Sequence, residues 1–101
     1  MAHIILAGTV CEKLGKELAH VTGRPLYVLG QLIERGETIP IATIIQDEGV
    51  DAYREIESVY LESVLRREPG VVVLHPQTLE NQRNYNMVVG HCVIHVANPN
   101  C

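Results

Sequence analysis

Short apolar runs rich in Val, Ile and Leu alternate with helix-like segments along the whole chain. Uninterrupted apolar runs are typical of strands buried on both faces, and strands that alternate with helices form βαβ units with a parallel sheet. Because such crossovers are right-handed, helices cover both faces of the sheet. The pattern therefore predicts an α/β three-layer sandwich. The predicted strands lie in 3–8 (HIILAG), 24–30 (RPLYVLG), 70–76 (GVVVLHP) and 91–99 (HCVIHVANP).

The intervening segments carry helix signals. Glycine or proline marks several of the predicted ends, with Gly23, Gly36 and Gly49 as stops and Pro40 near a start. These signals predict helices over 11–23, 31–36, 39–49 and 50–68, and a polar helix or turn over 77–88.

The segment 50–68 is the longest with helical periodicity. Its apolar residues recur at intervals of three and four, which predicts one apolar stripe on a helix. We expect Asp51 to cap the start of this helix. The predicted stripe consists of Ala52, Ile56, Val59, Tyr60, Val64 and Leu65.

Size and composition agree with this architecture. A chain of 101 residues is long enough for one domain with a modest core, so we expect a single domain over 1–101. Apolar residues make up 47% of the chain, and Phe and Trp are absent. The core is therefore expected to consist mostly of Val, Ile and Leu.

Charge and hydropathy argue against several classes of partner. The net charge is −4 and the 8 Lys and Arg are scattered, whereas a nucleic-acid-binding protein presents a basic stripe. No apolar run approaches the roughly 18 residues of a membrane span, and MAHIILAG lacks the basic region of a signal peptide. We expect no nucleic-acid or membrane partner and a cytoplasmic protein with 3 reduced cysteines.

The run GRPLYVLGQLIERGETIPIATIIQDEGVDAYREIE resembles the shikimate kinase family, small kinases of the P-loop class. That family reads approximately Gly-Arg-Pro-aromatic-x-Asp-x-Asp-x-x-Ile-Glu, then Ile-x-x-Ile-Phe, then Gly-Glu-x-x-Phe-Arg-x-x-Glu. The resemblance covers almost the whole chain and implies the P-loop kinase fold, with its strand order beginning 2-3-1-4. The matching residues are Gly23, Arg24, Pro25, Ile33, Glu34, Ile41, Ile44, Gly49, Arg54 and Glu57, while Tyr53 replaces the Phe.

The same comparison predicts a degenerate phosphate loop at Gly8, Thr9 and Lys13. A phosphate loop needs the pattern G-x-x-x-x-G-K-[ST], whose glycines, lysine and hydroxyl hold the phosphates and Mg²⁺. When GKELA is aligned with the family, Gly8 lies three residues too close to it, and Val10 and Glu12 stand where an anion would bind. We expect Lys13 and Lys16 to be helix-surface residues rather than a phosphate lysine.

Further family features are missing. The Asp-x-Asp that binds the substrate and positions Mg²⁺ is replaced by Val28 and Gly30, and the glycine triplet after the third strand by LHP over 74–76. The catalytic lid, the fifth strand and the adenine-contacting segment have no counterpart in this sequence. Phosphoryl transfer depends on positioning and charge neutralisation, so we expect no kinase activity and no cofactor.

Arg54 matches the arginine that, in the family, holds the substrate carboxylate, a task suited to a guanidinium fork. The alternative is a structural ion pair with Glu57 or Glu34, or with the neighbours of Glu55 on the same helix surface. His75 follows the third strand, where open α/β sheets bind ligands, but the sequence shows no partner carboxylate for it. Arg54 and His75 are therefore the predicted residues of a small-carboxylate pocket.

The remaining candidates receive structural interpretations. His91 and His95 lie about 13 Å apart if they are on one strand, too far to share a metal ion. Cys11, near a helix start, has no accompanying histidine motif and is expected to be an idle thiol. We therefore predict no metal site.

The predicted fourth strand, apolar on both faces, would lie at an edge of the sheet. Exposed edges of this kind invite pairing with another chain, so we expect a homodimer or larger oligomer. The sequence thus predicts a catalytically inactive shikimate kinase-like domain with a structural, regulatory or carboxylate-sensing role. The alternatives are a phosphotransferase that uses Lys13 or Lys16 in an unconventional loop, and a different enzyme based on His75 or Cys11.

Overall fold

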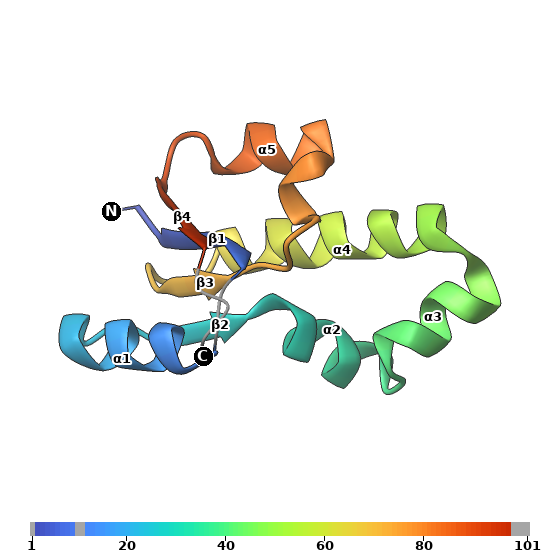
Figure 1. Cartoon of the computed structure of the whole chain (residues 1–101), viewed down its shortest axis with the longest axis horizontal. Coiled ribbons are helices and arrows are strands. Elements are labelled where there is room, and N and C mark those ends of the chain that lie inside the picture. The colour runs from blue at the N-terminus through green and yellow to red at the C-terminus, as the bar shows by residue number, and fades with distance from the viewer. Residues whose placement is uncertain (1, 10–11, 98–101) are drawn as a thin grey trace.

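The computed structural model describes residues 2–9 and 12–97. Within these residues, 4 strands form one parallel sheet in the order β2-β3-β1-β4. The predicted α/β class, parallel sheet and strand order are confirmed (Figure 1). The strands are β1 (Ile4–Thr9), β2 (Leu26–Val28), β3 (Val71–Val73) and β4 (Cys92–Ala97).

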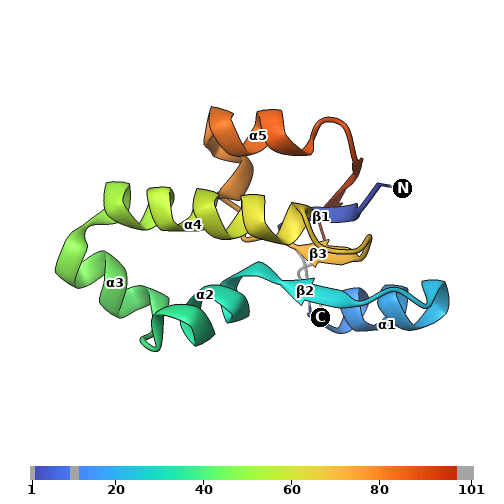
Figure 2. The same cartoon turned by 180° about the vertical axis from the view of Figure 1, so that it is seen from behind.

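Helices cover both faces of the sheet and continue past its end. They are α1 (Glu12–Thr22), α2 (Leu29–Glu37), α3 (Ile41–Glu48), α4 (Val50–Leu65) and α5 (Gln82–Val88), with the short 3₁₀ helix η1 (Thr78–Glu80) before α5. Helix α1 lies on one face of the sheet, and α4 and α5 lie on the other (Figures 1 and 2). Helices α2 and α3 lie beyond the carboxyl ends of the strands, so they enclose the region where ligands bind in this class of fold.

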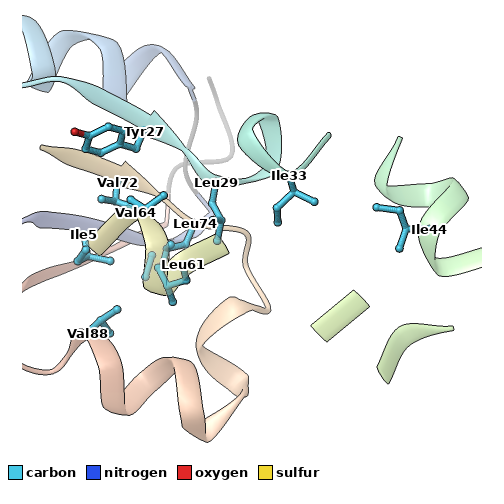
Figure 3. Packing of buried hydrophobic residues seen from close by; sticks show 11 residues of the cluster. Ile5, Tyr27, Leu29, Ile33, Ile44, Leu61, Val64, Val72, Leu74 and Val88 are labelled. Atoms are coloured by element: carbon cyan, nitrogen blue, oxygen red, sulfur yellow. The ribbon is translucent and has the colours of Figure 1, made fainter. Parts of the chain in front are cut away.

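The core is divided by the sheet into two parts because successive strand residues point to opposite faces. In β1, Ile5 packs on the α4 side while Leu6 packs on the α1 side, and in β3 Val72 and Val71 divide in the same way. All three residues of β3 are buried, as expected for an inner parallel strand. The larger cluster, on the α4 side, extends to α3 through Ile33 and Ile44 (Figure 3).

Two predicted boundaries between β2 and α3 are wrong. The strand over 24–30 contains only Leu26–Val28, and Leu29 and Gly30 already belong to α2. Gly36 does not end α2, which continues to Glu37 and is followed by Thr38 in the left-handed region at φ 63°. The predicted start of α3 near Pro40 and its stop at Gly49 are confirmed.

The predicted buried stripe of α4 is also partly wrong. Val59 is 54% exposed, whereas Leu61, Glu57 and Ser58 are buried. The periodicity of apolar residues missed the two polar positions because their burial depends on hydrogen bonds from other elements. Asp51 does not cap α4 either; Gly49 occupies the N-cap position, with no side-chain hydrogen bond.

Strand β4 lies at the edge of the sheet, as the sequence predicts, and pairs with β1. Its residues Cys92, Ile94 and His95 are exposed. The predicted continuation of the strand to Pro99 lies outside the described residues. None of the helices in the described part of the chain is long and apolar enough to span a bilayer.

Two histidines, His3 and His91, form hydrogen bonds at the amino-terminal end of the sheet. The Nδ1 atom of His3 accepts a hydrogen bond from the Gly70 backbone N–H (3.1 Å), and Nε2 lies 3.1 Å from the carbonyl oxygen of Leu65, to which it donates. The backbone N–H of His3 donates to Nδ1 of His91 (3.0 Å). Burial lowers the pKa of His91, and the neighbouring His3 lowers it further.

These contacts predict that the fold is sensitive to acid. A protonated His91 cannot accept the hydrogen bond from His3, and its lowered pKa means that the unfolded chain binds more protons just below pH 6.5. The free energy of unfolding should therefore fall as the pH drops through about 6.5 toward 5. Urea unfolding at pH 7.5 and 5.5 measures this fall.

The matched comparison is His91→Gln against His95→Gln, because His95 is an exposed histidine of β4, the strand that follows His91. The first substitution should reduce the pH dependence, since it removes the titrating ring, and the second should leave it unchanged. Equal pH dependence in His91→Gln and the unsubstituted protein would contradict this role of His91.

Candidate functional site

The connection that corresponds to a phosphate loop is short. Strand β1 ends at Thr9 and α1 begins at Glu12, and Val10 and Cys11, between them, lie outside the described residues. Gly8 has φ +89°, and a Cβ there would lie 2.5 Å from the carbonyl oxygen of Val96. Gly8 is thus required by the close approach of β4.

The lysines of α1 are engaged with acids of the same helix. Lys13 Nζ lies 4.0 Å from Glu17 and Lys16 Nζ lies 3.8 Å from Glu12, and both lysine side chains are mostly exposed. The Glu12 carboxylate also accepts a hydrogen bond from Gln31 Nε2 (2.8 Å). The helix-surface interpretation of both lysines agrees with these positions.

Arg54 and His75, the two predicted residues of a carboxylate pocket, line one pocket of about 270 Å³. Helix α4 contributes Arg54 from its second turn, and the segment after β3 contributes His75. Helix α3 forms an apolar wall with Ile41 and Ile45. The pocket therefore combines a cationic side, an imidazole and an apolar wall, which is the usual composition of a small-molecule site.

The Arg54 guanidinium is exposed and makes no ion pair or side-chain hydrogen bond with any of residues 2–9 and 12–97. The predicted alternative, an ion pair with Glu57 or Glu34, is wrong for a physical reason. Glu34 instead accepts the backbone N–H of Ile41 at the start of α3 (2.8 Å), and Glu57 is held by hydroxyl groups. The guanidinium is therefore available to an anion in the pocket.

Glu57 is a buried carboxylate in the wall of this pocket, 4% exposed. Its Oε2 accepts hydrogen bonds from Thr78 Oγ1 (3.0 Å) and from the Tyr53 hydroxyl (3.4 Å). Burial, together with the adjacent Glu57 carboxylate, raises the pKa of the Tyr53 hydroxyl. Tyr53 thus remains a neutral hydrogen-bond donor across the physiological pH range.

Thr78 links this carboxylate to His75. The Thr78 hydroxyl, fully buried, accepts the backbone N–H of His75 (3.0 Å) while it donates to Glu57. A hydroxyl can do both because it carries one donor and two acceptor positions. The carboxylate partner of the His75 region, which sequence reasoning did not find, is therefore Glu57, with Thr78 between them.

The signal for this cluster was weak in the sequence. Glu57 lies one helical turn after Arg54, so the two were expected on one side of a helix. Tyr53 and Thr78 carry hydroxyls, but nothing in the sequence places Thr78 against α4. The contact arises because η1 folds back over α4, where Asn84 of α5 accepts a hydrogen bond from the buried Ser58 hydroxyl (2.7 Å).

The described residues contain no group of three or more His, Cys, Asp or Glu side chains that could hold a metal ion. His91 instead accepts a backbone hydrogen bond, and His95 is an exposed residue of β4. The expected idle thiol of Cys11 lies outside the part of the chain that is described.

Comparison with known proteins identifies the family of this chain. The sequence model of shikimate kinase matches residues 12–99. The chain belongs to the shikimate kinase family. The matched region contains Arg54, Glu57 and His75, and it begins just after the short connection that follows β1.

Two curated shikimate kinases are similar in sequence. The enzyme from Chlorobium phaeobacteroides is 32% identical over 83 residues, which are 82% of this chain and 42% of that protein. The enzyme from Rhodococcus jostii is 26% identical over 83 residues, which are 82% of this chain and 49% of that protein. The region of this chain that matches therefore corresponds to less than half of the length of either relative.

Solved shikimate kinase structures share the fold. The enzyme from Acinetobacter baumannii, solved in complex with shikimate, has a TM-score of 0.91 at 23% identity, covering 98% of this chain and 57% of that one. The enzyme from Aquifex aeolicus has a TM-score of 0.88 at 20% identity, covering 97% of this chain and 61% of that one.

The pocket lined by Arg54 and His75 should depend on the Thr78 hydroxyl. Thr78→Val preserves shape but leaves the His75 N–H without its acceptor and removes one donor from the Glu57 carboxylate. Loss of buried partners costs about 1–3 kcal/mol, so the free energy of unfolding should fall by about that amount in urea titrations. Thr78→Ser, which retains the hydroxyl, should recover most of it.

Thr22→Val is the control, because the Thr22 hydroxyl is bonded to the backbone of its own exposed helix turn. That substitution should change stability by no more than about 0.5 kcal/mol. An equal effect of Thr78→Val and Thr22→Val would contradict the bridging role of Thr78.

Proposed function

We propose that this shikimate kinase-family domain binds a small carboxylate in the pocket between α3 and α4 and does not transfer a phosphoryl group, so that its role is sensing or regulation. The proposal rests on Arg54, an arginine in a pocket wall with no protein anion paired to it among the described residues. Guanidinium groups bind carboxylates through two parallel charge-assisted hydrogen bonds, which are stronger than hydrogen bonds between neutral groups.

The rest of the pocket suits the remainder of such a ligand. Ile41 and Ile45 offer apolar contact to a carbon skeleton. Tyr53 and Glu57 line the same pocket, and a hydroxyl on the ligand can hydrogen-bond to them. The volume of about 270 Å³ is at the small end for ligand sites, which favours compact molecules. Shikimate, the ligand named for the Acinetobacter baumannii enzyme, is the first candidate.

Internal substitutions support the absence of phosphoryl transfer. Two residues separate β1 from α1, which is too short for the loop that cradles phosphates, and the first residue of α1 is the acid Glu12. Val28 and Gly30 stand where the family has acidic residues, so no carboxylate is available there to position a substrate or Mg²⁺. Phosphoryl transfer needs these groups for charge neutralisation.

The Arg54→Ala substitution tests the proposal. Calorimetric titration of the unsubstituted protein with shikimate and with benzoate should reveal binding of at least one, and Arg54→Ala should weaken it by about 10-fold or more, because a charge-assisted hydrogen-bond pair is lost. Arg66→Ala is the control, since Arg66 lies at the other end of α4 in a surface pair with Glu62. It should leave the affinity unchanged.

Titration with ATP distinguishes carboxylate binding without phosphoryl transfer from a phosphotransferase activity. ATP with Mg²⁺ should neither bind in calorimetry nor be turned over to ADP. Saturable ATP binding lost in Lys13→Ala or Lys16→Ala would instead support the phosphotransferase with an unconventional loop. Carboxylate binding that is unaffected by Arg54→Ala would overturn the proposed site.

We also propose that the domain self-associates through the edge of β4. The strand offers an outer row of backbone groups and has no charged side chain between Cys92 and Ala97, so two copies can pair without like-charge repulsion. Light scattering at micromolar concentration should give at least twice the mass of 11.2 kDa, and Ile94→Lys should shift the protein to the monomer. A monomer before substitution would contradict this proposal.

A further inference from the structure

We infer that the His75 side chain separates two neighbouring hollows and so limits the size of the carboxylates that this domain binds. The inference rests on the proposed function, because it concerns the size of the ligand that Arg54 holds. His75 lines the carboxylate pocket, and it also lines a second hollow of about 220 Å³ at the carboxyl ends of the strands. The imidazole therefore stands between the two spaces.

The second hollow contains the ends of β1, β2 and β3. Thr9, Val28 and Val73 line it, together with Glu12 of α1. A ligand bound to Arg54 that extended toward β1 would have to pass the His75 ring to enter this space. With the ring in place, the ligand is restricted to the pocket of about 270 Å³ between α3 and α4.

The imidazole lies in this position because residue 30 has no side chain. A Cβ added to Gly30 would collide with Nε2 of His75 and would lie 3.2 and 3.3 Å from its Cε1 and Cδ2 atoms. Gly30 is in the first turn of α2, at a backbone conformation that other residues adopt readily. A larger residue at position 30 would therefore have to displace the His75 ring, and it would meet no backbone strain.

The backbone of His75 is fixed as well. Its N–H donates to Thr78 Oγ1 (3.0 Å) and its carbonyl oxygen accepts the Thr78 N–H (3.1 Å). The following Pro76 restricts His75 to extended backbone conformations. These contacts fix where the Cβ of His75 lies, and the exposed ring extends from it to the surface of Gly30.

These constraints define a ligand class. The domain should accept compact carboxylates with a single ring or a short chain, and it should reject those that carry a second ring or a bulky group on the side facing the strands. Removal of the imidazole should join the two hollows and relax this limit. His75 is thus a specificity-determining residue, and Gly30 is the residue that positions it.

A double-substitution cycle tests the contact without any ligand. Gly30→Ala should change the melting temperature less favourably in the unsubstituted protein than in the His75→Ala background, because only in the former must the new methyl group displace the ring. In the His75→Ala background the same change should have no effect or raise the melting temperature, since alanine favours helix more than glycine does. If Gly30→Ala alone does not fold, recovery of folding in the double variant gives the same result. Equal shifts in both backgrounds would overturn the contact.

A pair of probes tests the size limit. Benzoate and 4-phenylbenzoate carry the same carboxylate, and the second has an additional ring. By calorimetry the protein should bind benzoate at least 10-fold more tightly than 4-phenylbenzoate, and His75→Ala should reduce this ratio at least 10-fold. His95→Ala, an exposed position on β4, is the control and should not change the ratio.

The outcomes separate this inference from the proposed function. An unchanged ratio in His75→Ala, with both probes still dependent on Arg54, would overturn this role of His75 and leave the carboxylate site intact. Failure of both probes and of shikimate to bind any variant would overturn the proposed function and the size limit together. The melting-temperature cycle would then still decide whether the His75 ring rests on Gly30.

Discussion

A carboxylate buried under a helix must be hydrogen-bonded, and the site depends on how Glu57 meets this requirement. Its two hydroxyl partners, Tyr53 and Thr78, come from its own helix and from the segment after β3. The bond to Thr78 fixes the distance between α4 and the end of β3, and the same hydroxyl holds the His75 backbone. Arg54, one turn before Glu57 on α4, lines the same pocket as His75. A buried polar group with hydrogen-bond partners from two elements thus holds together the pocket wall that carries Arg54.

Two unusual residues at this end of the sheet lie in contact. In the shikimate kinase pattern that this sequence resembles, an acidic residue occupies the position of Gly30, and a glycine triplet occupies that of residues 74–76. The end of the His75 side chain lies against Gly30, where the Cβ of any other residue would collide with it. The two positions are therefore coupled, because a side chain at residue 30 and an imidazole at residue 75 compete for the same space.

Much of the fold was predictable because its signals are local. Apolar runs and glycine or proline stops gave the number and order of the elements, and the resemblance of the Arg-x-x-Glu segment gave the strand order. The errors occurred where long-range contacts override local signals. Gly36 resembles a helix stop, yet α2 passes through it because it packs against the Tyr60 ring of α4. Glu57 has the character of a surface residue, yet it is buried because Thr78 reaches it from 21 positions away.

The sequence by itself determined the class of fold, the family and the short connection after β1, and its resemblance to the family singled out Arg54 as a candidate. The class of fold follows from periodicity and the family from motif spacing, which are properties of neighbours along the chain. Only the tertiary structure decided that Arg54 has no protein partner in the described residues, that Glu57 and Thr78 hold the pocket together, and that the His75 ring lies over Gly30. Such contacts depend on how helices and strand ends meet in space, because each joins residues from different elements whose distance along the chain says nothing about their separation.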